Sequence, residues 1–410
     1  MSSSGKKILM MTDANFLAHV SRCTEIAKIL REDYGYEIVF AGDGRFMSLP
    51  RQLGFATDKV FTVPGQRTLE LAKRAGLVSY RWWNDACVRS IWSDLDCIRR
   101  QRPDAVLGDM HWSAGTAAEM AGLPYISVTN AHWTNYFSAR IRALRDHFTT
   151  RLFGPKRAER MIPLLRDYLG KYWVLPYIRF RKKHGLSTDR YRNILVLTEG
   201  DLTLLADIPE YGPTEGRPET MHYVGPIMWE PEMGLPAWFD RLDERRPTFY
   251  FTMGSTGYKR FFVDAIQLFG DTEYQVIITT GGLGLELDRI PKNCFVEKFA
   301  PGRPIMEKSH VVVNHGGNGT VYQAIVSGTP VIGIPYHIDQ EINLQRVEEL
   351  GIGLFLSERT CTPDVLIGAI ETILRDRRYK ENVERLKGSV SRFEGARLAA
   401  QHIDAFLSAS

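Results

Sequence analysis

The sequence predicts an α/β protein with two doubly wound parallel sheets, one in each half of the chain. Between Lys7 and Thr129, short apolar segments alternate with amphipathic helical segments, a pattern typical of a parallel sheet covered by helices. The proline-containing stretch 223–246 interrupts this alternation, which begins again at Thr248. The chain has 410 residues, which is enough for two domains of about 200 residues each.

The elements of the first half follow from hydrophobic periodicity. Short apolar runs are expected as buried strands at 7–12, 37–41, 103–107 and 124–129. A helix is expected over 21–31, because four apolar residues fall on one of its faces: Cys23, Ile26, Ala27 and Leu30. Gly35 ends that helix, and another helix is expected over 113–121.

The second half repeats the alternation, with strands expected at 248–252, 275–279, 311–313 and 331–334. After the third of these strands a turn carries Gly316, Gly317 and Gly319, which let the backbone bend sharply and approach a ligand. Thr320 is expected to cap a helix that begins at Val321. That arrangement leaves backbone N–H groups and the positive helix end facing the turn.

Residues 311–340 together predict a site for a sugar nucleotide. The helix N-terminus is an anion site, and His315 beside it adds a hydrogen-bond donor. Asp339 and Gln340 follow the next strand, at the carboxyl edge where open α/β sheets bind ligands. A phosphate site at one end and hydroxyl-binding side chains at the other fit this ligand. The alternative is a dinucleotide fingerprint, but Tyr322 occupies its third glycine position.

These residues resemble the donor-binding signature of family 1 glycosyltransferases, the UDP-sugar-dependent enzymes with the two-domain GT-B fold. The matching pieces are Phe299-Ala300-Pro301, His315-Gly316-Gly317-Asn318-Gly319-Thr320 and Asp339-Gln340. The chain looks most like the bacterial macrolide and antibiotic branch of that family.

The resemblance implies two Rossmann-like, doubly wound domains facing a central cleft. The acceptor-binding domain is expected over 1–222, a linker over 223–247 and the nucleotide-sugar domain over 248–390. The remaining residues, 391–410, are expected to form a helix that packs back on the first domain.

The resemblance also implies an inverting reaction with a histidine base. His19, after the first strand and just before a helix, occupies the place of the family's catalytic histidine, and Asp109 matches its acidic partner. A histidine suits this task because its ordinary pKa is about 6.5. A neighbouring carboxylate fixes the tautomer and stabilises the imidazolium. Taken singly, His19 could be a helix residue without a role, and Asp109 a helix cap.

The expected donor is a UDP-hexose, most simply UDP-glucose. The diphosphate would be held by His315, by the helix start and by backbone N–H groups of Gly254, Ser255 and Thr256. The resemblance adds residues for the base and the sugar: Phe299, Ala300, Gly317, Asn318, Gly319, Thr320, Gln323, Asp339 and Gln340. Phe299 could equally be a core residue.

Two departures from the family pattern leave the choice between UDP and dTDP open. Gly302 replaces a glutamine that is common in plant members. Gln323 stands where a glutamate commonly binds the ribose, and an amide offers one acceptor where a carboxylate offers two.

No metal ion is expected in the reaction. The sequence has one DxD-like pair, Asp94 and Asp96, and it lies within a helix expected over 93–100. Residues two apart on a helix point in different directions, so this pair is predicted to lie on a solvated helix face.

The acceptor is expected to be a small, flat or lipophilic molecule. Trp112, Thr129 and Trp133 lie at strand ends or in the loops that follow, where aromatic side chains would line an apolar pocket. His111 and His132 precede the two tryptophans. Packing of the tryptophans in the core is the alternative.

Composition narrows the function class. The net charge of +4 is small for this length and gives no reason to expect nucleic acid binding. The five cysteines are scattered and contain no C-x-x-C pair, which favours a reducing compartment. The N-terminal residues lack an apolar signal core, and no window approaches a membrane span of about 20 apolar residues. A cytoplasmic protein is expected.

The segment Arg140–Lys183 is strongly basic, with thirteen Lys and Arg against three acidic residues and with interleaved aromatics. Solvated surface helices are the simplest interpretation. Peripheral contact with anionic lipid or with an acidic acceptor is the more specific interpretation, and binding of single-stranded nucleic acid is the weakest.

Two functions other than transfer to a small acceptor stay open: transfer to a lipid at a membrane surface, and a non-catalytic nucleotide-sugar-binding partner of another transferase.

Overall fold

The computed structural model describes residues 5–64, 79–254, 259–282, 284 and 289–409. The chain divides into two compact units. Unit 1 consists of Met1–Arg140, Arg160–Trp229 and Phe393–Ser410, and unit 2 of Ile141–Glu159 and Glu230–Arg392. Each unit contains one parallel sheet, so the predicted α/β class with two doubly wound sheets is confirmed.

The sheet of unit 1 has the strand order β3-β2-β1-β4-β5-β6-β7, and every pair of neighbours is parallel. Its strands are β1 Lys7–Thr12, β2 Glu37–Ala41, β3 Ala56–Asp58, β4 Ala105–Asp109, β5 Tyr125–Thr129, β6 Leu202–Leu205 and β7 Met221–Tyr223. The direction of winding reverses between β1 and β4. In open α/β sheets the crevice at this switch point is where ligands bind.

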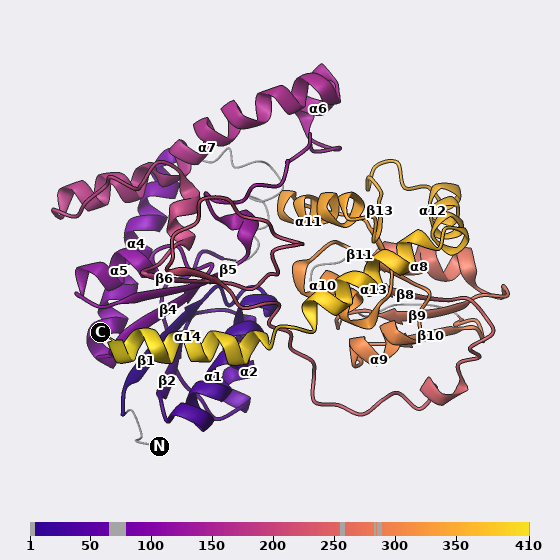
Figure 1. Cartoon of the computed structure of the whole chain (residues 1–410), viewed down its shortest axis with the longest axis horizontal. Coiled ribbons are helices and arrows are strands. Elements are labelled where there is room, and N and C mark those ends of the chain that lie inside the picture. Colours follow the sequence, from indigo (N-terminus) through magenta and orange to yellow (C-terminus); the bar gives the residue numbers. More distant parts are fainter. Residues whose placement is uncertain (1–4, 65–78, 255–258, 283, 285–288, 410) are drawn as a thin grey trace. The chain divides into compact units, whose positions relative to one another are not determined.

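Helices cover both faces of the sheet of unit 1 (Figure 1). They are α1 Leu17–Tyr34, α2 Ser48–Gln52, α4 Tyr80–Gln101, α5 Ala114–Met120 and α14 Gly395–Ala409. Most of α7 Pro155–Lys183 also belongs to unit 1, where it packs against α4. Three single-turn segments complete unit 1: Arg45–Met47, Ala131–Trp133 and Ile194–Thr198.

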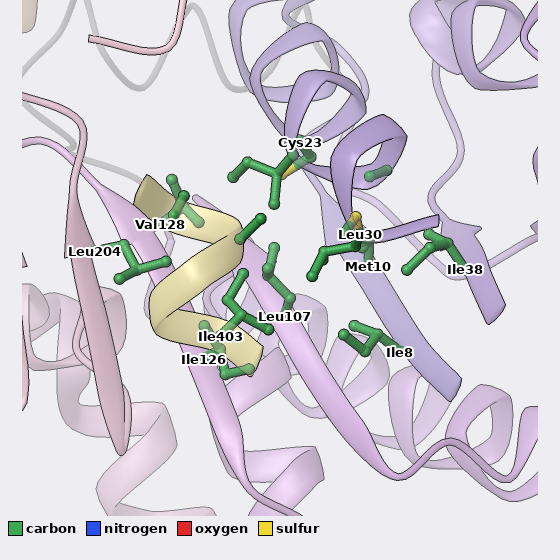
Figure 2. Close-up of a cluster of buried hydrophobic side chains, with 14 of the residues drawn as sticks. Ile8, Met10, Cys23, Leu30, Ile38, Leu107, Ile126, Val128, Leu204 and Ile403 are labelled. Atoms are coloured by element: carbon green, nitrogen blue, oxygen red, sulfur yellow. The ribbon is translucent and has the colours of Figure 1, made fainter. Parts of the chain in front are cut away.

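The last helix, α14, lies in unit 1 although the chain before it belongs to unit 2. Its apolar residues recur every four positions, and these side chains are buried: Ala399, Ile403 and Leu407. Figure 2 shows Ile403 among Leu107, Ile126 and Leu204 of the sheet. The final helix therefore completes the core of unit 1.

Unit 2 contains a six-stranded parallel sheet of order β10-β9-β8-β11-β12-β13. Its strands are β8 Thr248–Thr252, β9 Gln275–Thr279, β10 Cys294–Glu297, β11 Val311–Asn314, β12 Val331–Gly333 and β13 Gly353–Phe355. The larger helices are α8 Lys259–Phe269, α9 Gly302–Glu307, α10 Asn318–Ser327, α11 Ile338–Glu349, α12 Pro363–Arg375 and α13 Arg378–Val390, with short α6 Phe148–Phe153 and a turn at Phe239–Arg241. The switch point lies between β8 and β11.

One segment lies in a different unit from the one expected. Residues 141–159 were assigned to the first domain, but they group with unit 2. Arg145 explains the difference, because its backbone N–H bonds Glu341 at 2.5 Å and its guanidinium pairs with Glu348 at 2.9 Å. Arg142 adds a 2.8 Å ion pair to Glu348. These partners lie on α11, so contacts that are remote in sequence decide where the segment belongs.

The basic segment is also less solvated than its simplest interpretation predicted. Arg142 and Arg145 are paired as described, and Arg181 is only 2% exposed. Arg181 binds Glu119 at 2.6 Å and the Ser187 carbonyl at 2.7 Å. Part of this segment is therefore structural. Over the described ranges, none of the helices has the length and apolar content that crossing a bilayer requires.

Candidate active site

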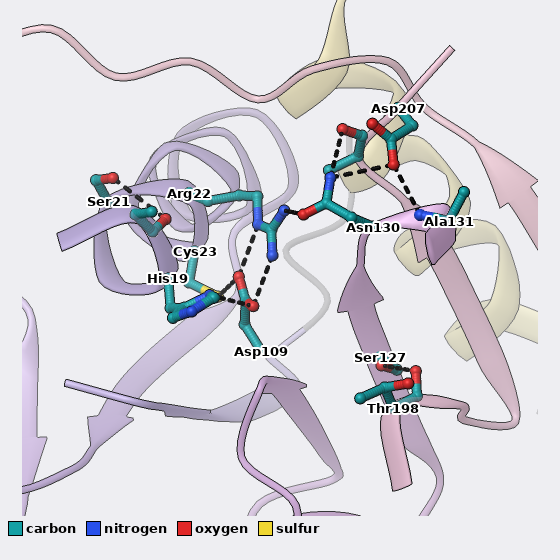
Figure 3. Close-up of polar contacts among 12 residues, drawn as sticks. His19, Ser21, Arg22, Cys23, Asp109, Ser127, Asn130, Ala131, Thr198 and Asp207 are labelled. Atoms are coloured by element: carbon teal, nitrogen blue, oxygen red, sulfur yellow. Dashed lines mark hydrogen bonds and ion pairs between the residues drawn. The ribbon is translucent and has the colours of Figure 1, made fainter. Parts of the chain in front are cut away.

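His19 and Asp109 meet at the switch point of unit 1. Thr12, the last residue of β1, is in register with Asp109, the last residue of β4. His19 lies in the first turn of α1, which follows β1. The His19 Nδ1 atom is 2.9 Å from Asp109 Oδ1 (Figure 3). The two residues predicted as a base and its partner are thus brought together.

The geometry assigns one tautomer to His19. A carboxylate only accepts hydrogen bonds, so Nδ1 carries the proton that His19 donates to Asp109. Nε2 is then the acceptor atom of the ring. The Asp109 side chain is fully buried, whereas that of His19 is 22% exposed. The pair can therefore present a proton acceptor to solvent or to a substrate.

Sequence reasoning missed two further partners of Asp109. Arg22 donates from Nε to Oδ2 at 2.7 Å and from a terminal nitrogen to Oδ1 at 2.6 Å. The Cys23 thiol lies 3.9 Å from Oδ2. His19, Arg22 and Cys23 are spaced i, i+3 and i+4 on α1, so they share the face that covers Asp109. The i, i+3, i+4 spacing in the sequence indicates such a shared helix face, but the helix prediction uses Cys23 only as a residue of the apolar core.

Asp109 is ionised in this setting. Burial raises the pKa of Asp109, but the charge of Arg22 and the interactions with His19 outweigh it, so the pKa lies below its ordinary value. Burial also raises the pKa of the Cys23 thiol, which stays protonated.

The polar contacts continue along the carboxyl edge of the sheet (Figure 3). Arg22 donates to the Asn130 side chain at 3.0 Å, at the end of β5. Asn130 in turn donates to Asp207, after β6, at 3.1 Å, and Asp207 accepts the Ala131 N–H at 2.7 Å. Asn130 is 8% exposed and Asp207 1% exposed. These residues form a buried chain that holds Arg22 in place.

A second buried histidine–aspartate pair lies close by. His111 Nε2 is 3.0 Å from Asp94, which is fully buried on α4. The prediction that Asp94 lies on a solvated helix face is therefore wrong, although Asp96 is exposed. Burial lowers the pKa of His111, but Asp94 and a hydrogen bond to the Thr12 backbone raise it above its ordinary value. His111 is buried and ties α4 to the sheet edge.

The three predicted acceptor residues have different surroundings. Trp112 packs edge-on against Trp83, 5.8 Å between ring centroids, in an aromatic cluster of α4 and α7. Thr129 is fully buried, so direct contact with an acceptor does not fit its burial in this structure. Trp133 is partly exposed, and its carbonyl accepts the Thr198 hydroxyl at 2.5 Å. Both tryptophans are therefore partly exposed, and their role in acceptor binding stays a prediction.

In unit 2, His315 follows β11 at the switch point, and Gly254 and Gly317 lie against its ring. A Cβ atom on Gly254, which follows β8, would lie 2.8 Å from the His315 ring. A Cβ on Gly317 would also lie 2.8 Å from it. Gly254 has φ +57°, a conformation that side chains other than glycine rarely adopt. Both glycines are therefore required by the histidine between them. Ser255 and Thr256, which were predicted beside them, lie outside the described residues.

His315 is neutral. Its side chain is buried, and burial, with a contribution from His337, lowers the pKa of His315 to about 3. Its Nδ1 atom is buried and has no hydrogen-bond partner among the described residues. Buried polar atoms are nearly always paired, so an unpaired one at a switch point is suited to receive a ligand.

The helix after His315 begins earlier than expected. Gly317 is the N-cap and α10 starts at Asn318, so the prediction that Thr320 caps a helix beginning at Val321 is wrong. The first helical bond runs from the Val321 N–H to the Gly317 carbonyl at 3.0 Å. No side chain caps the helix. The N–H groups of its first turn, from Asn318 to Thr320, have no acceptor within the helix, which makes this end an anion site.

The remaining predicted donor residues surround this helix and α11. Phe299 is 54% exposed, so its interpretation as a core residue is wrong, while Ala300 is buried. The Gln323 side-chain oxygen lies 3.1 Å from where a Cβ on Gly302 would be, so the two departures from the family pattern are neighbours.

Asp339 and Gln340 occupy the first turn of α11. Gln340 is 2% exposed, and its side-chain oxygen accepts the Tyr336 N–H at 2.8 Å. Gln340 therefore uses part of its hydrogen-bonding capacity to shape the loop before α11. Within the described ranges, no group of three or more His, Cys, Asp or Glu side chains converges as metal ligands would.

Comparison with known proteins places this arrangement among sugar-transferring enzymes. Residues 264–394 match the C-terminal domain family of erythromycin biosynthesis protein CIII-like proteins. A PGL/p-HBAD biosynthesis rhamnosyltransferase of Mycobacterium bovis is 32% identical over 393 residues, which cover 96% of this chain and 86% of that protein. A PGL/p-HBAD biosynthesis glycosyltransferase of Mycobacterium tuberculosis is 33% identical over 382 residues, covering 93% and 88%.

Solved structures share the fold at lower identity. The calicheamicin glycosyltransferase CalG4 superposes with a TM-score of 0.72 at 20% identity, covering 100% of this chain and 99% of that one. The glycosyltransferase VinC, solved in complex with dTDP, gives a TM-score of 0.70 at 20% identity, covering 98% and 100%. These likenesses support the GT-B architecture.

Proposed function

Because the chain belongs to family 1 of the glycosyltransferases, in its macrolide-type branch, we propose that it transfers a hexose from a nucleoside diphosphate sugar to a hydroxyl group of a lipophilic acceptor. The observation that carries this proposal is the His19–Asp109 pair, whose 2.9 Å contact leaves Nε2 of His19 as a proton acceptor. His19 removes the acceptor's hydroxyl proton while that oxygen bonds to the anomeric carbon. The bond from that carbon to the diphosphate breaks, and inversion results from attack on the opposite face.

The leaving diphosphate is bound by the residues at the switch point of unit 2. The unpaired Nδ1 of neutral His315 and the uncapped start of α10 supply hydrogen bonds and a positive dipole end. Such groups stabilise the developing negative charge without rearrangement. We therefore expect transfer to proceed without a divalent metal, so that saturating EDTA leaves the rate unchanged.

The identity of the transferred sugar is a separate question from the identity of the reaction. Glucose was the expectation from the sequence, yet one relative with 32% identity is named a rhamnosyltransferase. Gln340, expected to read sugar hydroxyls, has its side-chain oxygen engaged by Tyr336. Both observations support a 6-deoxyhexose such as rhamnose over glucose. UDP and dTDP donors remain candidates, since the VinC structure contains dTDP.

A lipid acceptor at a membrane surface is favoured by one surface feature. At the junction of α6 and α7, Leu152 is 72% and Phe153 is 45% exposed. Arg151, Lys156 and Arg157 beside them are exposed and form no ion pair among the described residues. Exposed apolar side chains among basic ones suit an anionic lipid interface. Sedimentation with phosphatidylcholine vesicles, with and without phosphatidylglycerol, tests this, and a Leu152→Ser, Phe153→Ser double variant should lose the binding.

The enzymatic proposal is tested by a donor and acceptor screen. Purified chain is incubated with UDP-glucose, UDP-galactose, dTDP-glucose or dTDP-rhamnose and with phenols, sterols or lipids, and nucleoside diphosphate release is measured. Release with at least one pair, abolished in His19→Ala, is the expected result. One relative is named an inactive glycosyltransferase, so a non-catalytic role is the alternative. Tight binding of UDP or dTDP with no release from any pair would favour that alternative.

A further inference from the structure

A buried arginine beside a catalytic base calls for a reason. Arg22 is 7% exposed, and it binds both oxygens of Asp109 at 2.7 and 2.6 Å. Bringing a guanidinium out of water costs several kcal/mol and is compensated only by good geometry and saturated hydrogen bonds. Each of the three Arg22 nitrogens donates a hydrogen bond, because its remaining terminal nitrogen donates to Asn130.

We infer that Arg22 is a positioning residue that sets the pH range in which His19 acts as a base; the inference rests on the function proposed above. An uncompensated carboxylate beside an imidazole favours the protonated, charged ring, which cannot act as a base. Arg22 places a positive charge on the same carboxylate, at Oδ1, the oxygen that His19 contacts. The compensated carboxylate still fixes the tautomer of His19, but it attracts a proton to the ring less strongly.

Among the titratable groups near this pair, His111 has a pKa above its ordinary value, but its partner is Asp94 and not Asp109. The Cys23 thiol on α1 and the Tyr125 hydroxyl on β5 both have pKa values raised by burial, so both stay neutral. Asp207, beyond β6, faces Arg22 through Asn130 and is fixed by the Ala131 N–H. Arg22 is therefore the group whose removal changes the charge balance at Asp109.

The geometry also explains why a lysine would not replace Arg22 fully. A guanidinium can bind both carboxylate oxygens and Asn130 at once, in one plane, whereas an ammonium is a point charge on a flexible stem. Lysine would keep the charge compensation and lose the fixed orientation. Glutamine would lose the charge and keep a hydrogen-bond donor.

The test is the pH profile of kcat/KM for wild type, Arg22→Gln and Arg22→Lys. In Arg22→Gln the acid limb should move to higher pH by at least about one unit, because Asp109 then stabilises the His19 imidazolium without compensation. Arg22→Lys should keep the limb within a few tenths of a unit while kcat falls. A matched control is Arg181→Gln, which removes another buried arginine of unit 1 from its carboxylate partner, the half-exposed Glu119 at 2.6 Å, and should not move the limb.

The outcomes separate this inference from the proposed function. A uniform fall in rate at every pH in Arg22→Gln, with the acid limb unmoved, would mean that Arg22 is only structural and would overturn the inference. If Arg22→Gln does not fold, the Arg22→Lys variant still tests the inference. Because lysine retains the positive charge, a shift of its acid limb by as much as one pH unit would also overturn the inference. Full activity in His19→Ala would instead overturn the base assignment, whatever the Arg22 variants do.

Discussion

At the residue scale, the candidate site contains groups whose protonation state is set by burial and by neighbouring charges. His19 was predicted because its place before a helix resembles the family pattern, and Asp109 because it ends a strand. Arg22 was not predicted, because its role depends on Asp109 lying opposite α1, which no local pattern specifies. The burial that makes His315 neutral likewise arises from packing between Gly254 and Gly317.

Gln323 permits a prediction about donor choice. Its amide is a weaker partner for ribose hydroxyls than a carboxylate, because a neutral hydrogen bond contributes about 1 kcal/mol and one to a charged group about 1.5–3 kcal/mol. We expect wild type to distinguish UDP from dTDP by less than about tenfold and Gln323→Glu to favour UDP more strongly. Competing titrations measure both, with Gln401→Glu on the exposed face of α14 as the control. A wild-type preference of several hundredfold would show that other groups read the 2′-hydroxyl.

Glu341 predicts a pH dependence of stability. Burial, opposed by the Arg145 N–H, raises the pKa of Glu341 to about 7 from an ordinary 4.5. Between these values the folded chain binds more protons than the unfolded chain, so the free energy of unfolding should fall as pH rises from 4.5 to 7. Glu341→Gln should remove this slope and add on the order of 1–3 kcal/mol at pH 8. Urea unfolding at pH 5 and 8 measures it. The exposed Glu381→Gln is the control, and an unchanged slope in Glu341→Gln would contradict the prediction.

At the element scale, the longer apolar strands were predicted, and so was the three-residue β12, but three other short strands were not. The strands β1, β8 and β9 coincide with expected apolar runs. The strands β3, β7 and β13 have three residues each, too few to show an alternation, and they exist because a neighbouring strand supplies hydrogen bonds. The helix α14 was expected from the family resemblance, with a start at residue 391, whereas it begins at Gly395 and its buried apolar residues pack in the core of unit 1.

The contribution of α14 to that core is measurable. Ile403 is fully buried among side chains of the sheet (Figure 2). Ile403→Ala leaves a cavity there and should cost unit 1 about 2–5 kcal/mol of unfolding free energy. Gln401→Ala, on the exposed face of the same helix, should change it by less than about 0.5 kcal/mol. Urea denaturation compares the two, and a loss below about 1 kcal/mol in Ile403→Ala would mean that α14 is not integral to unit 1.

At the scale of the whole molecule, the proposed chemistry is divided between the two units. The residues of the base and its partners belong to unit 1, and every described residue proposed for the donor belongs to unit 2. The domain assignment from sequence was contiguous, whereas the chain passes between units after Arg140, Glu159, Trp229 and Arg392. Sequence patterns report local structure, so they could not place 141–159 beside α11.

This division predicts that binding and turnover can be lost separately. His19→Ala should lower kcat by at least about a hundredfold, because the base acts in the transition state, while the Kd for UDP stays within about twofold. His315→Ala should weaken UDP by roughly ten- to a hundredfold, since it removes a hydrogen bond to a charged diphosphate. Calorimetric titration and initial rates on both variants measure the two effects. The control is His222→Ala, a partly buried histidine stacked on His402 in unit 1, which should change neither. Loss of UDP affinity in His19→Ala would mean that the base also takes part in donor binding, and the division between units would then be wrong.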